Sequence, residues 1–419
     1  MSKTDIKLNM LCLVLLLSGF KIFNTQSLMM SIYIFAAILL IFQHKSTTRP
    51  LLISKTNAIL FAFFICYCSA FFYFDGFQYS ILRTAIFSVL MYYIGTKMPF
   101  ITSSVDNYLK YTVFSIGIGM AMFAALSFFS SYTGRVLSTM NVMDRYVADF
   151  WNGLLIPPTN FNTNFLILFT AVAYVLTQVS SWKKVLLLTL TAAGVLVAFG
   201  TATRTNLFMI LLSFVLLVLF DVVYEHKKIE RPKGKLSPAK FRFGILMIIA
   251  LVAILAKFGE KITDLTENLF ASLSYRTGNY VKMSEDPRWK TWIDAFVGLL
   301  DYPMGNNTSM NVEAHNLILE AGRRTGIVPF VLLLLFVVRV LKNSIVLAKN
   351  HEIEYQARLL LFLVTVGTML AMMIEPVFVG RPFIFIYLSL VWGMTEGILR
   401  RKYQATYKCC SDSESVTVE

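Results

Sequence analysis

The chain is poor in charged residues. Of its 419 residues, 15% are Asp, Glu, Lys or Arg, whereas a soluble protein typically contains about 25%. Apolar residues make up 57% of the chain, and the mean hydropathy is +0.65. This balance excludes a water-soluble enzyme and a disordered chain, and it is typical of a protein that crosses a membrane several times.

Cysteine is also scarce, with five residues in the whole chain. Three lie in apolar segments and two lie in the C-terminal tail, with no spacing that suggests a disulfide framework or a metal site. The sequence also lacks zinc-ligand spacings, a glycine-rich phosphate loop and a serine-nucleophile motif. We therefore expect neither a metal nor a cofactor.

Long apolar runs, in contrast, are abundant. A bilayer-spanning helix needs roughly 20 mainly apolar residues, and the sequence predicts an all-α polytopic membrane protein with about twelve such helices. The predicted spans are 9–23, 28–43, 57–74, 80–96, 111–131, 164–179, 184–200, 204–222, 243–257, 327–345, 357–374 and 382–398.

The positions of the basic residues predict the orientation of these spans. With the N-terminus in the cytoplasm, most of the 38 Lys and Arg residues fall on the cytoplasmic side, as the positive-inside rule requires. The net charge of +14 is then largely an orientation signal. We therefore expect no nucleic-acid partner, although a charge of this size would suggest one in a soluble protein.

The loops predict the domain organisation. Residues 1–257 hold the first nine spans and a sizeable outer loop, 132–163. A larger outer loop, 258–326, contains short helices and separates the ninth span from the tenth. The last three spans occupy 327–398, and a cytoplasmic, disordered tail follows over 399–419.

His315 is the only one of the four histidines that this topology places outside. It lies near the start of a segment that we expect to be helical over about 313–321 and to break at a glycine before the tenth span. An imidazole titrates near neutrality, so it can take a proton from a hydroxyl or donate one to an anion.

Arg204 is the second candidate, because it lies at the outer start of the eighth predicted span. A helix N-terminus presents free N–H groups and the positive end of the helix dipole, and a guanidinium beside it can bind a phosphate in a bidentate manner. Thr201, Thr203, Thr205 and Asn206 surround it with small polar side chains.

Arg288 is the third candidate. It lies at the start of a helix that Asp286 and Pro287 open and that runs to about residue 300. Apolar residues fall on one face of this helix, which we expect either to pack on the bundle or to lie in the membrane interface. The face consists of Trp289, Trp292, Ile293, Phe296, Val297 and Leu300.

Further arginines populate the predicted outer side. We expect Arg145, Arg323 and Arg381 to bind substrate together with Asn316. Arg135, Arg276, Lys282 and Arg324 are further lesser candidates on this side, and for each lesser candidate we favour a structural role over a catalytic one.

In this arrangement the chain resembles the bacterial O-antigen ligase and polymerase superfamily. The likeness covers the whole chain in architecture, and it is specific in sequence over 200–210 and 286–326. Its motifs are Thr-Arg-Thr-Asn-Leu at 203–207, Arg288-Trp289 followed by Pro-x-Gly at 303–305, and His315-Asn316 followed by glycines.

The resemblance implies a metal-independent glycosyltransferase at the periplasmic face of a Gram-negative inner membrane. Its donor is a glycan on undecaprenyl pyrophosphate, and Arg204, Arg288 and His315 match the catalytic positions of the ligase pattern. In a ligase the acceptor is lipid A–core, and in a polymerase it is a second lipid-linked repeat.

Three assignments stay open at this point. The O-antigen ligase leads, and the polymerase is the alternative because loop 132–163 adds a second sizeable outer loop. A flippase or transporter predicts charges buried in mid-span and helices broken at matching places in the two halves. The two halves show no matching broken helices, and the outer clustering of Arg204, Arg288 and His315 favours an enzyme.

Overall fold

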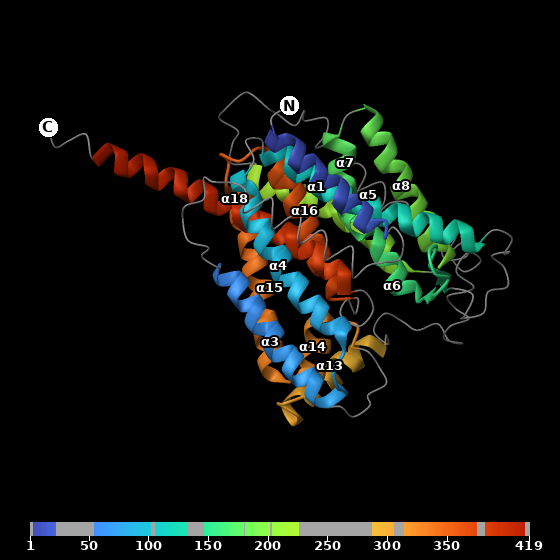
Figure 1. Ribbon diagram of the computed structural model, residues 1–419. Coiled ribbons are helices and arrows are strands. Elements are labelled where there is room, and N and C mark those ends of the chain that lie inside the picture. Colours follow the sequence, from blue (N-terminus) through green and yellow to red (C-terminus); the bar gives the residue numbers. More distant parts are fainter. Residues whose placement is uncertain are drawn as a thin grey trace. The chain divides into compact units, whose positions relative to one another are not determined.

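The computed structural model describes residues 3–21, 54–101, 105–132, 146–179, 181–201, 203–225, 287–305, 314–374 and 382–414 (Figure 1). Nearly all of them are helical, which confirms the predicted all-α class. The chain forms two compact units, one of residues 1–120 and 290–419 and the other of residues 121–289.

The first unit contains most of the helices described. They are α1 (Lys3–Gly19), α3 (Lys55–Asp75), α4 (Tyr79–Ile101), most of α13 (Pro287–Asp301), α14 (Leu317–Thr325), α15 (Ile327–Lys349), α16 (Tyr355–Met372) and α18 (Pro382–Glu414), with the start of α5 (Val105–Tyr132). The second unit holds the rest of α5 and a small hairpin before its remaining helices. These elements are β1 (Val147–Ala148), β2 (Leu155–Ile156), α6 (Pro158–Asn162), the 3₁₀ turn η4 (Thr163–Phe165), α7 (Leu166–Gln178), α8 (Ser181–Gly200), α9 (Arg204–Phe220) and the π turn η5 (Asp221–Glu225).

Seven helices in the described residues are long and apolar enough to cross a membrane. They match seven of the twelve predicted spans. The candidate spans are Lys55–Asp75, Tyr108–Ser131, Pro158–Gln178, Thr205–Glu225, Ile327–Lys349, Tyr355–Met372 and Phe383–Arg401. Three more predictions correspond to the helices α1, α4 and α8, and the remaining two, 28–43 and 243–257, lie outside the described residues.

Glycines bring α4 and α18 into backbone contact. A Cβ atom added to Gly393 or Gly397 of α18 would lie within 3.0 Å of the carbonyl oxygen of Tyr92 or Thr96 in α4, and one added to Gly95 would meet Leu390 in return. Helices in a membrane gain little from apolar burial against each other, so small residues that allow close packing stabilise their association. The Tyr92 hydroxyl adds a hydrogen bond to the buried Glu396 carboxylate, at 2.6 Å.

A second contact of the same kind joins α1 to the first half of α5. A Cβ atom on Gly119 would meet the carbonyl of Leu16, and one on Gly19 would lie 2.9 Å from the backbone nitrogen of Met120. The described residues of the first unit therefore include two helix pairs whose backbones touch, and both pairs use glycine.

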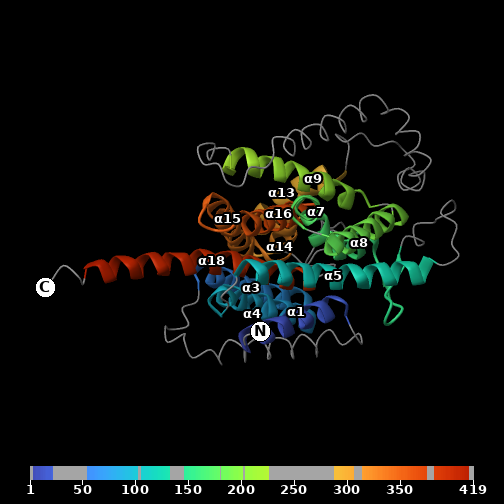
Figure 2. The same cartoon turned by 90° about the horizontal axis from the view of Figure 1, so that it is seen from above.

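The end of α18 differs from the prediction. The sequence predicts a disordered tail from residue 399, whereas α18 continues through Glu414. Residues 400–408 are rich in Arg, Lys, Gln and Ala, which favour helix, and they contain no Gly or Pro. The helix that begins in the apolar segment therefore continues beyond it, and its C-terminal part projects away from the other helices of its unit (Figure 2).

We predict that Gly393→Ala weakens the fold, because its methyl group has no room against Tyr92 and the helices must separate. The expected loss is about 1–3 kcal/mol, typical of overpacking. Gly298→Ala in α13 is the matched control, since nothing lies within 4 Å of its added Cβ and alanine has the better helix propensity. Thermal unfolding of the purified variants in detergent tests this, and equal midpoints for the two variants would contradict it.

Candidate functional site

The segment that carries His315 is a turn leading into α14. Asn316 caps this helix, and its side-chain oxygen accepts hydrogen bonds from the N–H groups of Ile318 and Leu319 at 3.0 and 3.1 Å. The side-chain nitrogen of Asn316 donates to the carbonyl of Met373, just after α16, at 3.2 Å. The capping residue therefore fixes the start of α14 and ties it to another helix.

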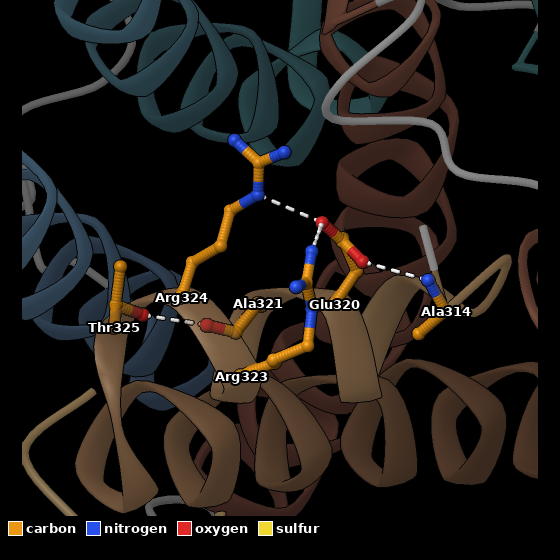
Figure 3. Close-up of polar contacts among 6 residues, drawn as sticks. All are labelled: Ala314, Glu320, Ala321, Arg323, Arg324 and Thr325. Carbon is orange, nitrogen blue, oxygen red and sulfur yellow. Dashed lines mark hydrogen bonds and ion pairs between the residues drawn. The ribbon is translucent and has the colours of Figure 1, made fainter. Parts of the chain in front are cut away.

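A single buried carboxylate organises the rest of this segment. Glu320 is 2% exposed. One of its oxygens accepts hydrogen bonds from Arg323 at 2.9 Å and from Arg324 at 2.7 Å, and the other accepts the N–H of Ala314 at 2.9 Å (Figure 3). A buried charge needs such partners, because an unpaired carboxylate inside a protein is strongly destabilising.

The charges of this cluster stabilise one another. Burial by itself raises the pKa of the Glu320 carboxyl, but hydrogen bonds from Arg323, Ala314 and Arg324 outweigh it, so the pKa lies below its ordinary value. Burial lowers the pKa of Arg324, but the hydrogen bond and the charge of Glu320 raise it above its ordinary value. At neutral pH the cluster is ionised, with two guanidinium groups around one carboxylate.

His315 lies between two anchored neighbours. Ala314 is bonded to Glu320 and Asn316 is bonded to the start of α14, while His315 itself adopts a φ of 48°, in the left-handed region. This conformation is uncommon for residues other than glycine, and such strained backbone is often found at functional sites. The partly buried imidazole thus extends from a backbone whose neighbours on both sides are anchored.

The junction of α14 and α15 is held by the turn that follows α13. A Cβ on Gly305 would lie 2.6 Å from the carbonyl of Arg324, and one on Gly326 would lie 2.5 Å from that of Pro303. Both glycines have positive φ, 96° and 94°, and the N–H of Ile327 donates to Pro303 at 2.8 Å. Only glycine suits these two positions, because it accepts positive φ and leaves room for the neighbouring backbone.

The α9 helix of the second unit starts beside a network of buried amides and hydroxyls. The side chain of Asn206 donates to that of Asn162 at 2.6 Å, and Asn162 in turn donates to the hydroxyl of Thr201 at 2.7 Å. Thr201 also lies 3.3 Å from the hydroxyl of Thr203, the residue that precedes the helix. These side chains connect α6, the end of α8 and the first turn of α9, so they fix the helix end on which Arg204 lies.

The structure brings some of the predicted site residues together. His315, Asn316 and Arg323 share the α14 segment of the first unit. The side chain of Asn316 donates a hydrogen bond to Met373 and that of Arg323 donates one to Glu320, so both residues position the α14 segment. Substrate binding by either residue stays a prediction.

The other predicted site residues are described only in part. Arg204 is the first residue of α9, and Arg288 is the second residue of α13. The side chains of both lie outside the described part of the structure, as do Arg145 and Arg381 entirely. A common site for Arg204, Arg288 and His315 therefore remains a prediction.

The α13 helix forms where the sequence predicts it, and several residues of its predicted apolar face are exposed. Ile293, Phe296 and Val297 are exposed, whereas Ala295 and Leu299 on the other side are buried. Between packing on the bundle and lying in the membrane interface, the choice for this face stays a prediction.

The helix around His315 is also shifted. It runs over Leu317–Thr325, four residues later than predicted at each end, because Asn316 caps it. Gly322 lies inside the helix under Phe330, where a Cβ would be only 2.9 Å from that ring's side chain, and Gly326 ends it.

Sequence reasoning missed two groups of residues. Glu320 lies three and four residues before Arg323 and Arg324, a spacing that places all three on one helix face, and this signal identifies it. Asn162 belongs to a run with three asparagines in five residues directly before an apolar segment, which is also a visible signal. Within the described residues, no group of His, Cys, Asp or Glu is arranged to hold a metal ion.

We predict that Glu320→Gln destabilises the protein at neutral pH, on the order of 3 kcal/mol, because two guanidinium groups lose their carboxylate. The pKa of Glu320 is lower in the folded than in the unfolded state, so its contribution is full above the unfolded value and is lost as the pH falls through the folded one. The difference in stability between wild type and variant should therefore shrink toward pH 4 and below.

Glu354→Gln is the matched control. Glu354 pairs with Lys110 at 3.7 Å and is exposed, so its loss should cost less than about 1 kcal/mol. Thermal unfolding in detergent from pH 7 to pH 3.5 measures both variants. A pH-independent difference between wild type and Glu320→Gln would contradict the ionised cluster.

Comparison of the sequence with models of known protein families gives no match. Comparison with curated proteins gives none either.

Proposed function

We propose that the protein is an O-antigen ligase-type glycosyltransferase of lipopolysaccharide biosynthesis. It transfers a glycan from undecaprenyl pyrophosphate to lipid A–core. In this proposal the chain has about twelve spans in a Gram-negative inner membrane, with residues 258–326 and the active site on the periplasmic side. The reaction needs no metal or cofactor.

The observation that carries the proposal is the fixed backbone at His315. A left-handed histidine between two anchored residues, at the start of a short helix that leads into a candidate span, is a preorganised arrangement for a base at the membrane surface. In the proposed reaction its imidazole takes the proton of the acceptor hydroxyl. The acceptor oxygen then bonds to the anomeric carbon of the donor while the bond from that carbon to the phosphate oxygen breaks.

The leaving group is undecaprenyl pyrophosphate, which gains negative charge as this bond breaks. Arg204 and Arg288 are proposed to stabilise that charge, an effect that accelerates the step because the charge is greatest near the transition state. The buried contacts of Asn162 with Thr201 and Asn206 support this role for Arg204, since they hold the first turn of α9 rigid.

An O-antigen polymerase remains the alternative. It uses the same donor chemistry and differs only in its acceptor, so the residues above would keep their roles. Part of the second loop, 132–163, is built into the β1–β2 hairpin, where the Asp149 side chain accepts a hydrogen bond from the N–H of Trp151 at 2.9 Å. In a polymerase this second outer loop could hold a second lipid-linked repeat, and the gel pattern below distinguishes the two enzymes.

We predict that Arg204→Ala, Arg288→Ala and His315→Ala each abolish transfer while membrane levels of the protein stay normal. The controls are His351→Ala and Arg339→Ala, which remove exposed side chains on α15 or just after it, away from its His315 end. Each variant is expressed in a strain that lacks the gene, and the lipopolysaccharide is separated on a gel. Wild-type lipopolysaccharide from all three site variants would overturn the proposal.

The gel of the deletion strain itself separates the functions. Loss of all capped core, with full-length lipid-linked polymer accumulating, identifies a ligase. Core that carries a single repeat identifies a polymerase. Normal lipopolysaccharide contradicts both.

A further inference from the structure

The α13 helix presents a row of large apolar side chains that nothing in the described residues covers. Ile293, Phe296, Val297 and Leu300 are 63%, 48%, 48% and 59% exposed. Their spacing of three and four residues places them on one side of the helix. A soluble surface rarely exposes such a contiguous apolar row.

The other side of the same helix is anchored. Ala295 and Leu299 are each 2% exposed, and the turn after the helix is fastened to the start of α15 by the hydrogen bond from Ile327 to Pro303. The exposed row is therefore an outward face of a fixed helix.

That anchor places the end of α13 beside the start of a candidate span. α15 begins at Ile327, and Val328, Val331, Leu335 and Val338 are exposed along its outer side, while Phe336 and Val340 are buried. In a membrane the exposed side of this span meets lipid. Because the carbonyl of Pro303, two residues after α13, accepts a hydrogen bond from the first residue of α15, the C-terminal end of α13 lies beside the start of this span.

Aromatic side chains gather at the same end of the unit. α3 packs against both α14 and α15. Tyr73, Phe77 and Tyr79 are exposed around the end of α3, and Tyr302 after α13 is exposed as well. Tyr and Trp are enriched where membrane meets water, so this end has the composition of an interface.

We propose that α13 is an interfacial membrane helix, whose face of Ile293, Phe296, Val297 and Leu300 inserts among the lipids at the boundary of headgroups and acyl chains. The occupant of the face is membrane lipid, because the end of α13 lies beside the start of α15, a candidate span whose exposed side meets lipid, and because the aromatic residue that follows α13, Tyr302, is exposed. The charged residues Lys290, Asp294 and Asp301 lie outside the inserted row, as they do in amphipathic helices of this kind. The proposal does not depend on the sugar chemistry.

Site-specific photocrosslinking tests this placement. The photoreactive amino acid p-benzoylphenylalanine replaces Phe296 in one variant and Val297 in another, and the purified full-length chain is reconstituted into vesicles of bacterial phospholipid. Both positions are exposed, so the substitutions leave the fold intact. The matched control carries the same label at Asp294, beside the row. After irradiation, mass spectrometry identifies the adducts.

We expect phospholipid adducts at positions 296 and 297, several-fold more abundant than at 294. Crosslinked dimers of the chain as the main product would overturn the proposal and assign the face to a second copy. Adducts to another segment of the same chain, or equal labelling at all three positions, would also overturn it, because the face would then be covered by protein or open to water.

Discussion

The site segment of the first unit depends on the buried carboxylate of Glu320. Its two oxygens accept three hydrogen bonds, from Arg323, Arg324 and the N–H of Ala314, so one side chain holds both the helix and the turn before it. Burying this charge costs free energy that only these partners offset. The left-handed backbone of His315 persists because its neighbours are fixed in this way.

Close backbone contacts hold the helices around this segment together. Gly393 and Gly397 let α18 touch α4, and Gly305 and Gly326 let the turn after α13 touch the start of α15. In lipid, apolar side chains gain little by meeting each other, so packing at short distance has a larger share in holding helices together than in water. The glycines therefore fix where the helices begin and cross, and a site built on such rigid elements keeps its geometry.

The sequence predicted the positions of the helices more reliably than the contacts that surround them. Apolar run length predicts the candidate spans, and Pro287 predicts the start of α13, because both signals are local to the helix they describe. Because Asn316 caps α14, the helix begins four residues later than the hydrophobic periodicity predicts. Periodicity contains no information about such a side-chain hydrogen bond. The hydrophobic pattern of α13 identified its apolar face. It did not indicate which side of the helix is buried in the protein, and that side carries Ala295 and Leu299.

By itself the sequence determined that the chain is a helical membrane protein and which residues are chemically able to act. Composition and run length decide these properties, because every backbone polar group in lipid must be satisfied within a helix or a closed barrel. Only the tertiary structure decided that Glu320 joins Ala314 to two arginines, and that Asn162 links α6 to the ends of α8 and α9. Such contacts depend on how close the folded backbone brings each donor to its acceptor, and a hydrogen bond tolerates only a few tenths of an ångström.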